Sequence, residues 1–100
     1  MAAIALLAGP ARAEGDVEAA RPIIADRCTV CHHVPGYPAP QYTAGGAAAS
    51  FQDIADGSQY DTPEKLTAFL HQPHFIIPGF SLSDEDIDNL VAFIVALRHE

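Results

Sequence analysis

The sequence predicts a single small all-α domain with three main helices and one long loop. Three observations carry this prediction. Apolar residues recur at helical spacing near the C-terminus, helix-starting signals precede two of the expected helices, and no competing strand pattern is visible. A chain of 100 residues suffices for one domain, but it buries only a limited core.

The first helix is expected within residues 16–31. Asp16 precedes it as an N-cap, because its carboxylate can accept a hydrogen bond from the first turn. Pro22 lies inside the helical pattern and cannot donate a backbone hydrogen bond, so the helix either kinks or starts there. The buried face of this helix is predicted to carry Val17, Ala20, Ile24 and Cys28.

Residues 33–61 are expected to form a long loop with one helical turn at 51–55. The loop is rich in helix-breaking residues, among them Pro35, Pro38, Pro40, Gly45 and Gly46. A loop of this length in a small domain usually surrounds something. The composition agrees, since the chain is 49% hydrophobic but rich in alanine and only 8% aromatic. A bulky apolar cofactor would supply the missing core.

Two further helices are expected after this loop. Thr62 as N-cap and Pro63 at the first helical position predict a helix that ends near Gln72. Ser83 predicts the start of the last helix, whose acidic first turn complements the positive end of the helix dipole. The last helix should bury a stripe formed by Ile87, Leu90, Val91, Ile94 and Leu97.

The net charge of −8 argues against nucleic acid as a partner, because phosphate binding needs more than the five Lys and Arg residues present. An acidic protein of this size can instead meet a basic protein surface. The acidic start of the last helix and Asp53, Asp56 and Asp61 are candidates for such steering. A face that only keeps the protein soluble is the alternative.

Residues 1–13 are expected to be the remnant of a secretory signal peptide, and residues 14–100 the folded domain. The apolar run ends in Ala11-Arg12-Ala13, a typical cleavage pattern, and is too short to span a membrane. Export places the chain in an oxidising compartment.

The stretch "CTVCH", from Cys28 to His32, is the strongest chemical signal in the chain. A thioredoxin-like dithiol would need a neighbouring strand, and a zinc site would need two more ligands, for which His71 and His74 are available. The third interpretation is covalent haem. The two thiols add to the vinyl groups of one porphyrin, and His32 gives its imidazole to the iron. Haem c, one per chain, is favoured because it also explains the loop and the small core.

The chain resembles the small class I c-type cytochromes of bacteria. The resemblance rests on "CTVCH", "SFQDIA", "TPEKLTAFLHQPH" and "LSDEDIDNLVAFIVALR". It implies a cytochrome c-like fold in which the first and last helices cross at right angles, and a role in carrying electrons between periplasmic redox proteins. Phe93 matches the family's aromatic residue in the last helix. Ala20 stands where relatives have glycine, so a looser helix contact is expected there.

The resemblance also raises the question of the second axial ligand of the iron. Relatives use a methionine before the last helix, and Ile77 occupies that position here. Met1, in the expected leader, is the only methionine. His74 is the first candidate to replace it and His71 the second, which would lower the reduction potential. Alternatively the iron stays five-coordinate and binds NO, CO or peroxide. The apolar residues expected against the haem on this side are Phe75, Ile76, Ile77, Pro78 and Phe80.

The proximal side needs a carbonyl that accepts a hydrogen bond from His32. Relatives often supply a proline carbonyl before the "SF" pair, and Ala49 stands there, with Pro35 and Pro40 as alternatives. His33 and His99 are expected at the surface. No enzymatic activity is expected from a saturated iron, and weak peroxidase activity is the alternative for an open distal site. The segment 71–80 contains no arginine to assist O–O cleavage.

Overall fold

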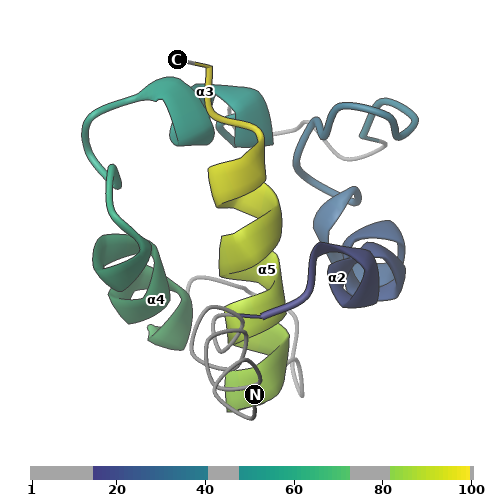
Figure 1. Ribbon diagram of the computed structural model, residues 1–100. Coiled ribbons are helices and arrows are strands. Elements are labelled where there is room, and N and C mark those ends of the chain that lie inside the picture. Colours follow the sequence, from purple (N-terminus) through teal and green to yellow (C-terminus); the bar gives the residue numbers. More distant parts are fainter. Residues whose placement is uncertain (1–14, 41–47, 73–81, 100) are drawn as a thin grey trace, which may run out of the picture.

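The computed structural model describes residues 15–40, 48–72 and 82–99, and these residues form helices and loops without strands. The predicted all-α fold is confirmed. Figure 1 shows α5 at the centre, with α2 and α4 on either side of it and α3 near its C-terminal end. The elements in chain order are α2 (Val17–Ile23), the π-helix η1 (Ile24–Cys28), α3 (Phe51–Asp56), α4 (Pro63–His71) and α5 (Asp84–Ala96).

The first helix starts at Val17 and continues through Pro22. Asp16 is the N-cap, and its side chain accepts a hydrogen bond from the backbone N–H of Glu18 at 2.9 Å. The proline has no N–H to donate one turn back, and the helix widens two residues later into η1. Thr29 N–H closes this wider turn on the carbonyl of Ile24 at 3.1 Å. The helix therefore does not start at Pro22, and it reaches Cys28 in a π-helical form.

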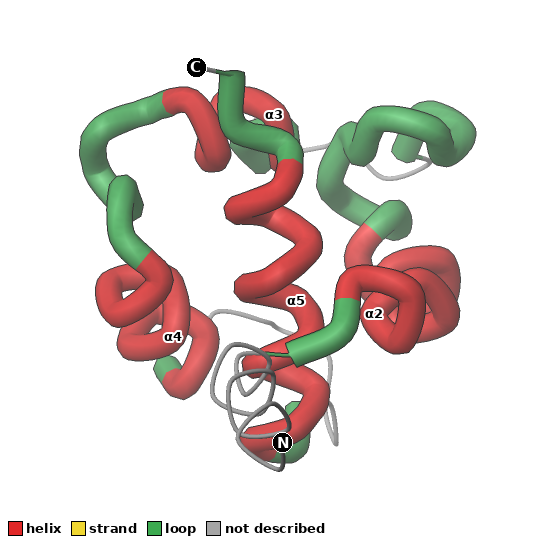
Figure 2. The backbone as a smooth tube through the Cα atoms, viewed as in Figure 1, coloured by secondary structure: helices red, strands yellow, loops and turns green. Residues whose placement is uncertain are grey.

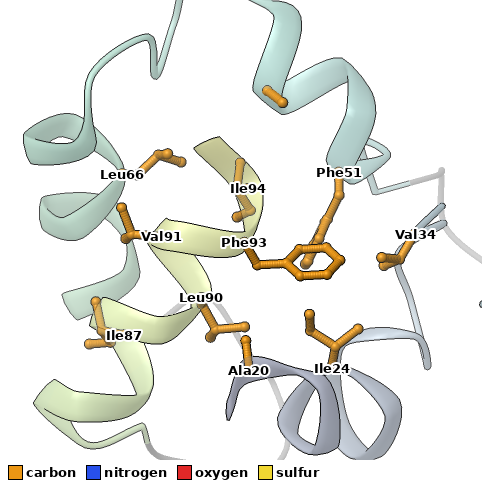
Figure 3. Close-up of a cluster of buried hydrophobic side chains, with 11 residues drawn as sticks. Ala20, Ile24, Val34, Phe51, Leu66, Ile87, Leu90, Val91, Phe93 and Ile94 are labelled. Carbon is orange, nitrogen blue, oxygen red and sulfur yellow. The ribbon is translucent and has the colours of Figure 1, made fainter. Parts of the chain in front are cut away.

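The junction of α2 and α5 is closely packed. Ala20 has 0% of its surface exposed and lies beside Leu90 of α5 (Figure 3). The segment just before α2 is tied to α5 by a hydrogen bond of 2.8 Å from the backbone N–H of Asp16 to Asn89 Oδ1. Asn89 is only 7% exposed, so this bond satisfies a buried amide oxygen. The side chain of Ala20 is therefore fully buried at the junction of α2 and α5.

The predicted starts of the last two helices are confirmed. Thr62 Oγ1 accepts the N–H of Lys65 at 3.1 Å, and Pro63 is the first residue of α4. Ser83 and Asp86 form a capping box at the start of α5, with hydrogen bonds of 3.0 and 3.2 Å. Helix α4 ends at His71, one residue before the predicted end.

The core lies where α5 meets the other helices (Figure 3). Four of the five predicted stripe residues of α5 are buried, and Leu97 is partly buried. Ile24, Val34, Phe51 and Phe93 complete the core on the side of η1 and the following loop. Figure 2 shows that loop, residues 29–40, and the second loop between α3 and α4 as non-helical chain. The predicted helical turn at 51–55 is present as α3, which extends to Asp56.

Candidate functional site

The two cysteines and His32 lie in one turn at the end of η1. Cys28 is the last residue of η1, and its carbonyl accepts hydrogen bonds from Cys31 N–H at 3.2 Å and His32 N–H at 2.9 Å. Both cysteines are free thiols, Cys28 partly buried and Cys31 exposed. This turn therefore presents two thiols and an imidazole within five residues.

The protonation of Cys28 bears on the dithiol interpretation. Burial raises the pKa of the Cys28 thiol to about 12, although the charge of Arg27 acts in the opposite direction. A reactive redox cysteine instead has a lowered pKa, because the thiolate is the nucleophile. The environment of Cys28 therefore does not favour thiol–disulfide chemistry.

The imidazole of His32 is oriented by the segment that precedes α3. Its Nδ1 lies 2.6 Å from the carbonyl oxygen of Ala49. A carbonyl oxygen can only accept, so Nδ1 carries a proton, and in the neutral imidazole the lone pair is then on Nε2. Of the three carbonyls considered from the sequence, that of Ala49 is the partner, and the prolines at 35 and 40 are not. The ring of Phe51 lies beside the imidazole, with 5.1 Å between ring centroids.

Aromatic side chains continue from His32 into the core. Phe51 and Phe93 have ring centroids 6.5 Å apart, as do Tyr37 and Phe93. The guanidinium carbon of Arg21 lies 5.5 Å from the centroid of Phe93, a cation–π contact at the surface. Figure 3 shows Phe93 of α5 pointing toward Phe51, with Val34 on the far side. Sequence reasoning missed the burial of Val34 and Phe51, because both lie in or beside the predicted loop.

The other histidines that the structure describes lie at the surface. His71, at the end of α4, has Nε2 3.8 Å from Asp84 Oδ1, and the side chain of Asp84 is 92% exposed. His33 is exposed, and so is His99, as expected. His99 Nδ1 nevertheless contacts Asp56 Oδ2 at 2.8 Å. This pair was not predictable from local sequence patterns, because 43 positions separate its members.

The first-choice distal ligand and the apolar residues expected beside it lie outside the described residues: His74, Phe75, Ile76, Ile77, Pro78 and Phe80. Within residues 15–40, 48–72 and 82–99, three or more His, Cys, Asp or Glu side chains nowhere gather in a way that could hold a metal ion. In the same ranges, no helix has the length and hydrophobicity needed to cross a membrane.

An all-α fold that presents two thiols and an oriented imidazole in one turn defines the class of proteins that bind haem covalently. A family model described as Cytochrome c matches residues 17–98, and the chain belongs to the cytochrome c family. It is a c-type cytochrome, and its cofactor is haem c, an iron porphyrin attached covalently. Proteins of this family generally transfer electrons with redox partners and are usually exported. No curated protein and no solved structure matches the chain.

Proposed function

We propose that this chain is a periplasmic monohaem cytochrome c that carries single electrons between redox proteins at low potential. The observation that carries the proposal is the contact of 2.6 Å between His32 Nδ1 and the carbonyl of Ala49. In the neutral imidazole this hydrogen bond places the proton on Nδ1 and the lone pair on Nε2, and it fixes the plane of the ring, as an axial iron ligand requires.

The donor set at the end of η1 fits haem c. The thiols of Cys28 and Cys31 would each form a thioether to the porphyrin, and His32 Nε2 would bind the iron. Bound there, the haem supplies a one-electron couple between Fe(III) and Fe(II). The buried side chains of Phe51 and Phe93 would exclude water from the proximal side of the group, since both are about 5% exposed or less.

We further propose His74 as the distal ligand. The sequence has no methionine after Met1, and a second imidazole stabilises Fe(III) more than a thioether does, which lowers the potential. Phe75, Ile77, Pro78 and Phe80 would cover the same face with apolar groups. His71 is less suited to this role, because its ring lies near Asp84 at the start of α5.

The cellular setting is part of the proposal. Residues 1–13 would be removed as a leader, and residues 14–100 would form the cytochrome domain in the periplasm. The partner would present a basic docking surface, because the chain carries a net charge of −8.

The absorption spectrum of the reduced holoprotein, with and without carbon monoxide, tests the proposed function. We expect sharp α and β bands that the gas leaves unchanged, because both axial positions of an electron carrier are occupied. Broad bands that shift at once on addition of the gas would mean an open iron site and a ligand-binding protein.

A further inference from the structure

The short helix α3 is joined to the proximal turn by three contacts at its N-terminal end. The carbonyl of Ala49 accepts from His32 Nδ1 at 2.6 Å, and the backbone N–H of Phe51 donates to the carbonyl of His33 at 3.0 Å. The ring of Phe51 also lies against the imidazole of His32. The position of the Ala49 carbonyl is therefore fixed together with the first turn of α3.

Helix α3 is joined to the end of the chain by a second set of contacts, made by Gln52 and Asp56. Gln52 Nε2 donates to the carbonyl of Leu97 at 2.7 Å and to Asp56 Oδ2 at 3.0 Å. Asp56 Oδ1 accepts the backbone N–H of His99 at 2.8 Å, and Asp56 Oδ2 contacts His99 Nδ1 at 2.8 Å. We call these four residues, Gln52, Asp56, Leu97 and His99, the C-terminal latch. Figure 1 shows the yellow end of the chain beside α3.

The latch matters because α3 is too short to hold its own position. A helix of six residues is not stable alone in water, so its place depends on what its two ends contact. Phe51 and Ala55 are buried in the core and Ile54 packs partly buried against it, while the polar side chains of Gln52 and Asp56 contact the latch. Releasing the latch leaves α3 held by the apolar packing of Phe51, Ile54 and Ala55 and by the proximal turn, without its polar contacts to the C-terminus.

We propose that the C-terminal latch is a positioning device for His32. Gln52 and Asp56 hold α3 against the C-terminus, and α3 in turn holds the Ala49 carbonyl at hydrogen-bonding distance from His32 Nδ1. The latch thereby sets the basicity of the imidazole and the reduction potential of the haem. This inference rests on the proposed function, in which His32 Nε2 binds the iron.

The direction of the effect follows from the hydrogen bond. A strong bond from Nδ1–H to a carbonyl makes the imidazole a better donor, which stabilises Fe(III) and lowers the potential. A loosened α3 lengthens that bond, weakens the donor and raises the potential. The exchange of the Nδ1 proton with solvent should accelerate at the same time, because the proton is less well held.

The test uses the matured holoprotein and two latch variants. Gln52→Leu removes the contacts of Gln52 Nε2 with the Leu97 carbonyl, Asp56 Oδ2 and His99 Nδ1 without a change in charge. Asp56→Asn removes the carboxylate with little change in shape. Asp53→Asn is the matched control: it makes the same charge change on the same helix, and only the backbone of Asp53 takes part in the helix cap. His99→Gln is a milder variant, which keeps the backbone bond from residue 99 to Asp56.

We expect both latch variants to raise the Fe(II)/Fe(III) ratio at a fixed solution potential by about threefold relative to Asp53→Asn. For a one-electron couple, a threefold change in this ratio corresponds to a rise of ~28 mV in the midpoint potential, since a tenfold change corresponds to 59 mV. His99→Gln should shift the ratio in the same direction by less. NMR of the reduced proteins should show faster exchange of the His32 Nδ1 proton in the latch variants than in the control.

Variants that bind haem but keep the potential and the exchange rate of the control would overturn the inference. If Gln52→Leu and Asp56→Asn do not fold, an unchanged potential and exchange rate in His99→Gln overturns it in the same way. Failure of the proposed function looks different, because the wild-type protein itself would then lack covalent haem or a saturated iron.

Discussion

His32 and Ala49 are joined by a hydrogen bond of 2.6 Å from the imidazole Nδ1 to the backbone carbonyl. Ala49 comes directly before Ser50, the N-cap of α3, whose side chain accepts the N–H of Asp53 at 3.0 Å. The carbonyl therefore belongs to a capped helix start rather than to a free loop. A rigid proline is not required at position 49, because the cap and the bond from Phe51 to His33 fix the local backbone.

Replacement of both cysteines tests the covalent attachment. The double variant Cys28→Ala/Cys31→Ala should release its haem completely on denaturation in acidified organic solvent, because both thioethers are missing. The measurement is the haem absorbance that stays with the polypeptide. Thr29→Ala, which changes a residue between the cysteines, should keep its haem. Retention of covalent haem by the double variant would contradict the assignment.

Replacement of the candidate distal histidine tests the second axial ligand. His74→Ala should broaden the α and β bands of the reduced protein and make them respond to carbon monoxide, because the sixth position opens. His71→Ala is the control and should leave the spectrum unchanged, since His71 lies beside Asp84 at the surface. The reverse pattern, with only His71→Ala affecting the bands, would assign the ligand to α4.

The acid stability of the fold should depend on Asp56. Hydrogen bonds from the His99 backbone, then from Gln52 and the His99 side chain, lower the pKa of Asp56 from 3.8 to about 2. A carboxyl group whose pKa is lower in the folded state stabilises the fold above its unfolded pKa and loses that contribution as the pH falls. The free energy of unfolding should therefore decline between pH 4 and pH 2 more steeply in the wild type than in Asp56→Asn.

Urea unfolding followed by circular dichroism at several pH values measures this slope. Asp53→Asn should keep the wild-type slope, because the hydrogen bonds of the latch are made by Gln52 and Asp56 and not by the side chain of Asp53. Equal slopes in wild type and Asp56→Asn would show that the contacts to His99 do not hold in solution.

Any side chain at position 15 should destabilise the fold, because the backbone of the N-terminal segment lies against that of α5 there. Gly15 has a φ of +120°, and a Cβ there would collide with the carbonyl of Asp88. Gly36 has a φ of +89° but open space around its Cα. Gly36→Ala should cost about 1–2 kcal/mol in backbone strain alone. Gly15→Ala should lower the free energy of unfolding by at least about 1 kcal/mol more than Gly36→Ala, because the backbone at residue 15 must also move away from that of Asp88. Thermal unfolding of both variants checks this order, and equal losses would contradict it.

Much of the fold was predictable because its helices begin with local signals. Asp16, Thr62 and Ser83 are caps whose partners lie two or three residues away, so a short window of sequence contains the whole interaction. The buried stripe of α5 was predictable for the same reason. The π-helical turn was not predictable, because a proline such as Pro22 is compatible with a kink, a helix start or a widened turn.

The site was predictable only in part. The spacing of Cys28, Cys31 and His32 identifies the cofactor, because the chemistry needs those three residues in one turn. The Asp56–His99 pair was not predictable, since it depends on how α3 meets the end of α5, which no local pattern encodes. Asn89 was missed for the same reason, because its partner, the backbone of Asp16, lies 73 positions away.

A potentiometric titration of the purified holoprotein, followed by its visible spectrum, tests the central claim most directly. The account predicts one reversible, one-electron transition with a midpoint below that of cytochromes with histidine and methionine ligands. A midpoint in the range of those cytochromes would contradict the proposed ligation. The absence of a reversible haem transition would contradict electron transfer itself.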